Sequence, residues 1–322
     1  MWLGYLFLEG FDFGVGMLLP VLAGNEAERR VMVNTIGPVW DGNEVWVIVA
    51  IGGTFAAFPG WYASLLSAAY LPVLFILLGL IGRGVAFDYR GKVDSVRWRR
   101  TWDRVIFVGS LVPALGVGLL IATTVFGLPL DVDGNRVGSV WGSVRGETIL
   151  GAVAFVGFAL VHGAVFLSLK TDGDIRRRAR RFASRVGPVA LTPLVALVIL
   201  AQFEFGSLWT WVAAGVVVVA AAIAFRRLAL GREGQAFAAL GVVVAAAVVS
   251  LFGALYPNVL PSTLDSDFSL TVEATASSPY TLEVISWLAL FGLPAVLAYQ
   301  GWTYWVFRKR VSTAHIPPVH VP

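Results

Sequence analysis

Apolar runs long enough to cross a lipid bilayer recur along the whole 322-residue chain, and this feature limits the fold more than any other. A membrane-crossing helix needs about 20 mostly apolar residues. Hydrophobic residues make up 57% of the chain and charged residues 14%, whereas roughly a quarter of a soluble domain is charged. The short alternating strands of a membrane β-barrel are absent from the sequence. The sequence therefore predicts an all-α polytopic membrane protein.

Nine spans are predicted from the hydropathy pattern. They lie at about 1–22, 38–57, 61–84, 104–127, 148–169, 186–203, 208–225, 236–256 and 282–307.

The basic residues fix the predicted orientation of these spans. Of the 24 Lys and Arg residues, 22 follow odd-numbered spans, and only Arg136 and Arg145 follow even-numbered ones. Because cytoplasmic loops of membrane proteins carry an excess of Lys and Arg, the N-terminus is predicted outside and the C-terminus in the cytoplasm. The net charge of +4 is therefore assigned to cytoplasmic flanks and not to nucleic-acid binding.

Two carboxylates interrupt the first span. Glu9 and Asp12 lie three residues apart and so share one face of a helix. Ionisable groups inside a membrane are costly, which makes them candidates for function. Gly10, Gly14 and Gly16 flank the pair and would let a neighbouring helix approach closely. We expect this face to point into a helix bundle, where the carboxylates serve either proton transfer or a structural bond between helices.

A second acidic pair opens the second span, in "PVWDGNEVW" (38–46). Asp41 and Glu44 are again three residues apart, and the predicted topology places Asp41 near the cytoplasmic mouth and Asp12 deeper. Carboxylates at successive depths on adjacent helices suggest a proton path entered from the cytoplasm. The alternative for Asp41 is a helix N-terminal cap, where carboxylates are favoured.

Candidate ligands for a haem or metal are scarce. There are no cysteines, which excludes thiolate chemistry. His162 is the one histidine within a span, for which we expect a hydrogen-bonded packing role. No metal-ligand spacing appears, so the chain is not expected to hold a haem by itself. Arg83, near the end of the third span, is expected to extend its charge toward the membrane surface.

Several segments resemble subunit II of cytochrome bd-type quinol oxidases. They are "GFDFGVGMLLP" (10–20), "ERRVMVNTIGPVWDGNEVW" (28–46), "FAAFPGWYA" (55–63), "FDYRGKVDSVRWR" (87–99), "LPSTLDSDFSLTVEATASSPYTLEVISW" (260–287) and "YWVFRKRV" (304–311). The resemblance is dense in residues 10–110 and 256–311 and thin from about 128 to 255.

The resemblance implies a fold of nine transmembrane helices, arranged as two four-helix bundles plus one peripheral helix. It implies a haem-free partner of subunit I, which carries b and d haems and a quinol site. The complex would oxidise quinol, reduce dioxygen to water with protons from the cytoplasm, and lie in the prokaryotic plasma (inner) membrane. A quinone bound in this subunit and a small accessory subunit are left open, as is a cyanide-insensitive variant without the d haem.

Residue roles follow from the same resemblance. Asp41 matches the acidic residue at the cytoplasmic entrance of the proton channel, and Asp12 matches an acidic position of the first helix. Trp46 matches an aromatic residue linked to the apolar passage for oxygen. Glu9 and Glu44 are further proton-transfer candidates, although relatives often carry Asp at the first position and Gln at the second.

The resemblance also suggests a division of the chain. Residues 1–127 would form the first four-helix half, 128–256 the second half with an outer loop, 257–311 an outer loop and the ninth helix, and 312–322 a disordered tail. The outer segment 256–280 is expected to be ordered and not a linker. Two other classes stay open: a proton-coupled secondary transporter, and a structural partner without a proton role.

Overall fold

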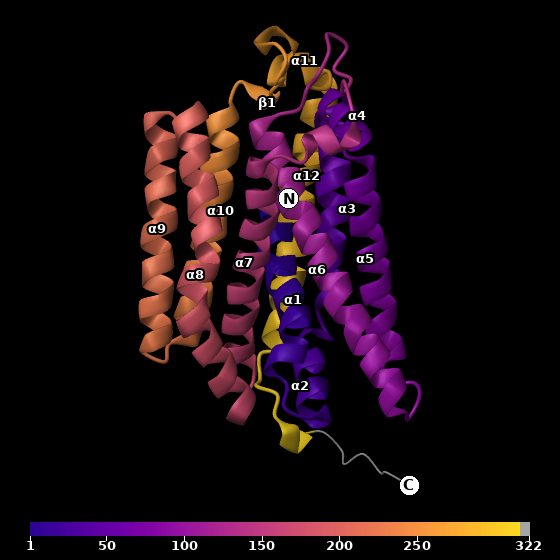
Figure 1. The fold of residues 1–322 in the computed structure, drawn as a ribbon, viewed down its shortest axis with the longest axis vertical. Coiled ribbons are helices and arrows are strands. Elements are labelled where there is room, and N and C mark those ends of the chain that lie inside the picture. Colours follow the sequence, from indigo (N-terminus) through magenta and orange to yellow (C-terminus); the bar gives the residue numbers. More distant parts are fainter. Residues whose placement is uncertain (316–322) are drawn as a thin grey trace.

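The structure is a computed structural model that describes residues 1–315, and it is built almost entirely from helices (Figure 1). In chain order the elements are α1 (Trp2–Leu22), α2 (Glu26–Ile36), α3 (Trp40–Ala57), α4 (Pro59–Ala68), α5 (Tyr70–Tyr89), α6 (Val96–Phe126), η1 (Val140–Ser143), α7 (Gly146–Lys170), α8 (Gly173–Phe205), α9 (Leu208–Ala229), α10 (Glu233–Leu255), β1 (Asn258–Leu260), η2 (Ser266–Phe268), β2 (Leu270–Thr271), α11 (Val272–Thr275), α12 (Pro279–Val306) and η3 (Thr313–His315).

Eight helices within residues 1–315 are long and apolar enough to cross a membrane. They are α1, α5, α6, α7, α8, α9, α10 and α12. The helix expected at 38–57 is present as the 18-residue α3, but it is not one of the eight. Its first turns carry Asp41, Asn43 and Glu44, which lower its mean hydropathy.

The predicted span 61–84 is wrong as a single helix. The chain forms α4 and then α5, with a break at Ala69. Pro59 begins α4 and Pro72 lies in the first turn of α5. Proline is favoured at these positions because the first N–H groups of a helix have no intrahelical acceptor.

Two helices begin well before their apolar runs. α6 has 31 residues and α8 has 33, which at 1.5 Å per residue is about 45–50 Å, longer than the hydrocarbon core of a bilayer at about 30 Å. The added turns hold the basic segments 96–104 and 173–185. Because Arg is a good helix former, these segments continue the helix beyond the apolar part.

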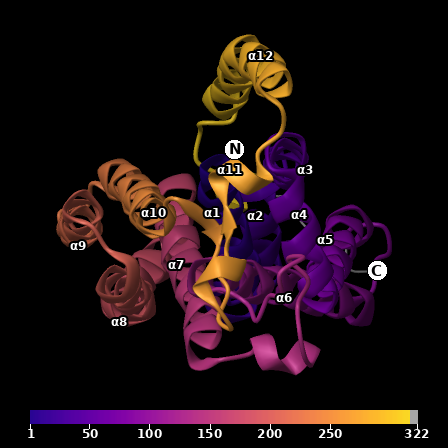
Figure 2. The same ribbon diagram turned by 90° about the horizontal axis from the view of Figure 1, so that it is seen from above.

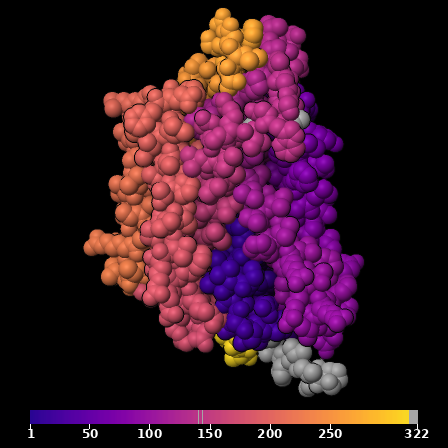
Figure 3. Space-filling model, viewed as in Figure 1, coloured from indigo at the N-terminus to yellow at the C-terminus, as the bar shows by residue number. Residues whose placement is uncertain are grey.

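The core surrounds α1. This helix packs against α3, α6 and α7, while α7 packs against α8 and α9 against α10. Seen from above, α1 lies at the centre of the bundle, and α12 stands apart on the side of α3 (Figure 2). No described residue of α12 is buried, whereas most residues of α1 are. In Figure 3 the indigo N-terminal segment, which comprises α1 and α2, is visible only in the lower half, between the flanking helices.

The segment 256–280 is ordered, as predicted. β1 pairs antiparallel with β2, with Asn258 opposite Thr271. The segment is attached to the helices at two points. The backbone N–H of Leu128 donates to Pro261 (3.0 Å), and that of Ser277 donates to Ala57 (2.9 Å). Gly127 has φ +77° and a Cβ there would overlap the Pro261 carbonyl, so only glycine fits this junction.

The opposite end of the bundle gathers the basic loops and holds them with ion pairs. Arg90 binds Asp103 at 2.6 Å, and Arg176 binds Glu233 at 2.8 Å. After α12 the chain returns to the bundle, where the N–H of Val311 donates to the Lys170 carbonyl at 2.8 Å. Of the predicted tail 312–322, residues 313–315 form η3, and 316–322 lie outside the described residues.

Candidate functional site

The two carboxylates of the first helix face the interior, as the spacing predicted. Glu9 and Asp12 are both 0% exposed on α1. The glycines beside them allow close packing: a Cβ on Gly14 would overlap the Ala159 carbonyl oxygen of α7 and lie 2.8 Å from Gly163 Cα. The approach of α7 therefore seals this part of α1 from lipid.

Arg83 binds two carboxylates from other helices with one nitrogen. Its Nη2 lies 2.7 Å from Glu9 Oε2 and 2.9 Å from Glu44 Oε2. Its guanidinium also lies 4.6 Å from the Phe13 ring centre. Arg83 is 0% exposed, so the expectation that its charge reaches the membrane surface is wrong. The physical reason is that carboxylates on α1 and α3 neutralise the guanidinium inside the bundle, where an unpaired charge would be very costly.

Asp12 makes a different contact. Asn43 of α3 is fully buried, and its Nδ2 donates to Asp12 Oδ2 at 2.8 Å. The Asn43 Oδ1 accepts from Gln300 Nε2 at 3.0 Å and from the Tyr304 hydroxyl at 2.8 Å, both on α12. One buried amide thus joins α1, α3 and α12.

Trp46 fixes the direction of these bonds. Its Nε1–H donates to Gln300 Oε1 at 2.7 Å, and an indole nitrogen can only donate. Gln300 must therefore turn its Nε2 toward Asn43, and Asn43 must turn its own Nδ2 toward Asp12. The Trp46 ring itself is only 6% exposed and lies against Gly4, where an added Cβ would be 2.7 Å from it.

The hydrogen bonds of Asp12, Asn43, Gln300, Tyr304 and Trp46 form one network. A cavity of about 330 Å³ between α3 and α12 reaches this network from the side of Asp41. Asp41, Asn43, Trp46, Gln300 and Tyr304 all contribute to its wall. Asp41 is exposed and lies in the first turn of α3, where its Oδ1 accepts the N–H of Gly42 at 2.7 Å. It is not the N-cap, which is Val39. The cavity therefore connects an exposed carboxylate to the residue that binds Asp12.

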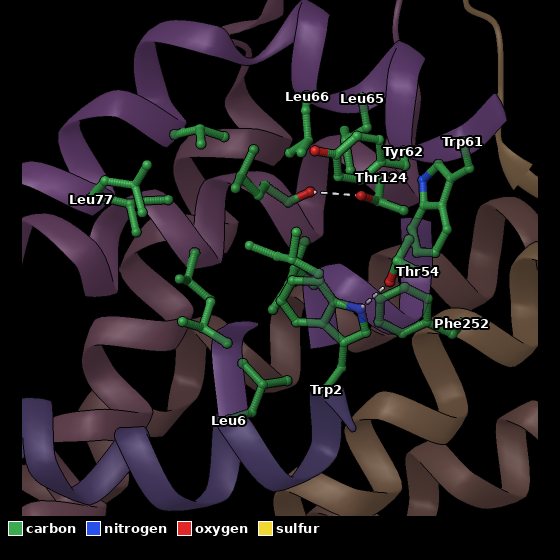
Figure 4. A pocket seen from close by; sticks show the side chains of 17 residues that line it. Trp2, Leu6, Thr54, Trp61, Tyr62, Leu65, Leu66, Leu77, Thr124 and Phe252 are labelled. Carbon is green, nitrogen blue, oxygen red and sulfur yellow. Dashed lines mark hydrogen bonds between the residues drawn. The ribbon is translucent and has the colours of Figure 1, made fainter. Parts of the chain in front are cut away.

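A second, apolar cavity of about 80 Å³ lies toward the other end of α3, between Trp2 and Leu6 of α1 and the helices α3 to α6 (Figure 4). The two threonine hydroxyls of its wall are occupied by bonds within the wall. Thr54 Oγ1 accepts from Trp2 Nε1 at 3.0 Å, and Thr124 Oγ1 donates to the Leu120 carbonyl at 2.9 Å. Most of the other lining side chains are apolar, which favours a small apolar solute over water.

His162 packs differently from the prediction. It is 0% exposed and lies among the rings of Phe7, Phe11, Phe158 and Phe237. Neither ring nitrogen has a hydrogen-bond partner within residues 1–315. The packing role is present, but the expected hydrogen bond is not.

The sequence analysis did not predict four residues of the site. Asn43, Gln300 and Tyr304 are polar but uncharged, and Arg83 was placed at the membrane surface. A polar residue inside an apolar run could have indicated these positions. Asn43, which lies between Asp41 and Glu44, is such a residue. Gln300 gives the same signal within "AVLAYQGWTYW" (295–305).

Comparison with known proteins agrees with this arrangement of helices. The family profile described as "Cytochrome bd terminal oxidase subunit II" matches residues 1–307. The chain is 42% identical over 320 residues to cytochrome bd ubiquinol oxidase subunit 2 of Bacillus subtilis (strain 168), which covers 97% of this chain and 94% of that one.

A more distant relative and a solved structure extend the comparison. Cytochrome bd-I ubiquinol oxidase subunit 2 of Escherichia coli (strain K12) is 32% identical over 354 residues, with 98% of this chain and 93% of that chain covered. A chain of the bd oxidase from Geobacillus thermodenitrificans has the same fold, with a TM-score of 0.75, 19% identity and 94% coverage of each chain. This chain belongs to the family of cytochrome bd terminal oxidase subunit II.

Proposed function

We propose that this chain is the haem-free second subunit of a quinol-oxidising, oxygen-reducing membrane complex, and that it conducts protons from the cytoplasm toward a haem in subunit I. The proposal rests on one observation. The cavity between α3 and α12 has Asp41 and Asn43 in its wall, and Asn43 binds the buried Asp12. A proton that enters at Asp41 can thus reach Asp12 through water in this cavity.

The cavity has the size for this task, and polar groups lie in its mostly apolar wall. Liquid water occupies about 30 Å³ per molecule, so about 330 Å³ holds several molecules. Polar partners for them are available from Asp41, Thr303 and the network residues. The amides of Asn43 and Gln300 hold the chain of bonds in place, while water and carboxyl groups carry the proton. Glu9 and Glu44 lie beside this path as the ion-pair partners of Arg83, and their own part in proton transfer is a prediction.

The orientation in the membrane is part of the proposal. The end that holds the basic loops would face the cytoplasm, with the 256–280 segment outside. With α3 as a ninth crossing beside the eight apolar helices, residues 1–127 and 128–256 would form two four-helix halves, and α12 would be the peripheral helix. Asp41 then opens toward the cytoplasm, which is the side from which protons must come.

We also propose that this subunit takes part in oxygen access. Trp46 contributes to the wall of the α3–α12 cavity, and Val47, the next residue of α3, contributes to the wall of the apolar one. Dioxygen is small and apolar, so it dissolves in lipid and needs no polar contact on its way to a haem. The partner haem-bearing chain, the quinol and any small accessory subunit belong to the same proposal.

The decisive experiment replaces Asp41 and Asp12 with Asn in the complex purified by a tag on this chain. Each variant should slow oxygen consumption by about 10²-fold or more, because a positioned proton-transfer group typically contributes at least that factor. The haem absorption spectrum should stay unchanged. The control is Asp88→Asn, an exposed carboxylate near the basic end of α5.

Normal oxygen consumption in both Asp variants would refute the proton route. A tagged chain that purifies without a haem protein, and that moves protons together with a solute by itself, would favour the transporter instead.

A further inference from the structure

The region around Glu9 contains buried polar atoms whose bonds are incomplete. Within residues 1–315, no hydrogen-bond partner is found for the Tyr5 hydroxyl, Glu9 Oε1, Asp12 Oδ1, or Arg83 Nε and Nη1. All four side chains are 0% exposed. Buried polar atoms are rarely left unpaired, and those that are need an explanation, which here is water or a mobile proton.

The charges of this region do not balance. Glu9 and Asp12 are fully buried, and within residues 1–315 Arg83 is the one cation that binds Glu9 or Glu44. The Glu44 side chain is 22% exposed, so water can solvate part of its charge. If Glu9 and Asp12 were both ionised, the fully buried groups would carry a net charge of −1. Because an uncompensated charge inside the bundle is very costly, one of these two carboxyl groups must retain a proton.

The contacts indicate which carboxyl group retains it. Glu9 and Glu44 each accept a charged bond from Arg83 Nη2, and such a bond holds a carboxylate in its ionised form. Asp12 has no such bond. Its Oδ2 accepts from Asn43, so its free Oδ1 is the atom that can carry a hydrogen.

Among residues 1–315, no cation other than Arg83 faces this part of α1. Charged and titratable groups that face this part of α1 are Glu9 and Tyr5 on α1 itself, Glu44 on α3, Arg83 on α5, His162 on α7 and Tyr304 on α12. α6 presents the hydroxyl of Ser110 near Gly16. His162 lies within its cage of phenylalanine rings, which disfavours a charged imidazole.

We propose that Arg83 is a positioning residue for proton delivery: by binding Glu9 and Glu44 it keeps both ionised and leaves Asp12 as the group that holds the mobile proton. In each cycle Asp12 gives its Oδ1 proton toward the site of oxygen reduction and becomes a carboxylate. A proton from the α3–α12 cavity then restores the acid. This inference rests on the proposed proton route and assigns a role to a residue outside it.

The test is the infrared C=O signal of protonated carboxyl groups, recorded on the purified complex. The native complex should show a signal that Asp12→Asn removes and Glu9→Gln preserves. Arg83→Met should add a second protonated carboxyl, because Glu9 loses its cation, and should slow oxygen consumption by about tenfold or more. Arg83→Lys keeps the positive charge and should keep the single signal. Asp133→Asn, an exposed outer carboxylate, is the control and should change nothing.

The outcomes separate the inference from the proposed route. A signal that survives Asp12→Asn and disappears in Glu9→Gln would overturn the role of Arg83, even when Asp12→Asn slows turnover. Should Arg83→Met fail to assemble, the Glu9 and Asp12 variants still decide, because neither removes the cation. Normal oxygen consumption in Asp12→Asn would instead refute the route on which the inference rests.

Discussion

Asn43 donates its amide hydrogen to Asp12 across 2.8 Å. The indole of Trp46 fixes this direction through Gln300, which accepts from Trp46 and donates to Asn43. Because Trp46 can only donate, Gln300 and Asn43 each have one allowed orientation. Asp12 therefore always receives a hydrogen at Oδ2. The network explains how a helix with no buried residue, α12, is attached to the middle of the bundle.

Asn43→Asp tests this direction with almost no change in shape. The new oxygen would still accept from Gln300 and Tyr304, but it would face Asp12 with an acceptor in place of a donor. We expect a loss of stability of about 1–3 kcal/mol, the usual cost of an unsatisfied buried polar group, together with slower oxygen consumption. Thermal unfolding of the complex and its oxygen uptake measure the two effects.

The matched control for that change is Asn34→Asp on α2, where the side chain is exposed. Both variants add one negative charge to the same chain. Equal unfolding temperatures for the two variants would show that the Asn43 bond has no directional role.

Trp46 allows its polar and apolar parts to be tested separately. Trp46→Leu removes most of the ring, so we expect the apparent KM for dioxygen to change. Trp46→Phe retains a ring but loses the N–H that orients Gln300, so we expect slower turnover with a smaller change in that KM. Oxygen-consumption traces at limiting oxygen give both quantities.

Trp211→Leu serves as the control for loss of an indole, because Trp211 is half-exposed on α9. If Trp46→Leu and Trp211→Leu have the same apparent KM as the native complex, Trp46 does not lie on the gas route.

The helices could be predicted from the sequence because each depends on the residues of its own segment. Long apolar runs give membrane-crossing helices wherever they occur, and eight of the nine predicted segments correspond to a single helix each. The exception, 61–84, was wrong because the chain breaks at Ala69 within an apolar run and begins a new helix at Tyr70, with Pro72 in its first turn. The starts of α6 and α8 were missed because their basic turns remain helical without being apolar.

The site was predictable only in part. The buried orientation of Glu9 and Asp12 follows from their spacing and from the glycines beside them. Their partners do not, since Arg83 lies 74 residues from Glu9 and Gln300 lies 257 residues from Asn43. No local pattern encodes such contacts. In the sequence, Arg83 does not differ from other basic residues near a helix end. Its role follows only from the carboxylates of α1 and α3 that lie beside it in the fold.

Close packing of α1 against α7 gives a test of the fold around the site. Gly14→Ala would place a Cβ on the Ala159 carbonyl oxygen, and we expect a loss of about 1–3 kcal/mol from the forced shift of backbone. Gly215→Ala on α9 meets nothing within 4 Å and should leave stability unchanged or raise it by about 1 kcal/mol, since Ala is the better helix former. Equal unfolding temperatures for the two would contradict this packing.

Arg178 and Arg177 are neighbours in α8 that should differ sharply when replaced. Arg178 binds Glu28, which is 7% exposed, and also donates to the Leu22 carbonyl at 2.8 Å, at the end of α1. Arg177 binds Asp174 on the same helix, and both of these side chains are largely exposed. Arg178→Ala removes the cation of the buried Glu28, which among the described residues keeps only the N–H of Gly24 as a donor (2.5 Å), and removes a donor from the Leu22 carbonyl. We expect a loss of about 1–3 kcal/mol. Arg177→Ala should change stability by less than about 1 kcal/mol, because exposed ion pairs contribute little. Thermal unfolding of the two purified variants at low and high salt measures this difference, and an equal effect would show that Arg178 does not anchor the end of α1.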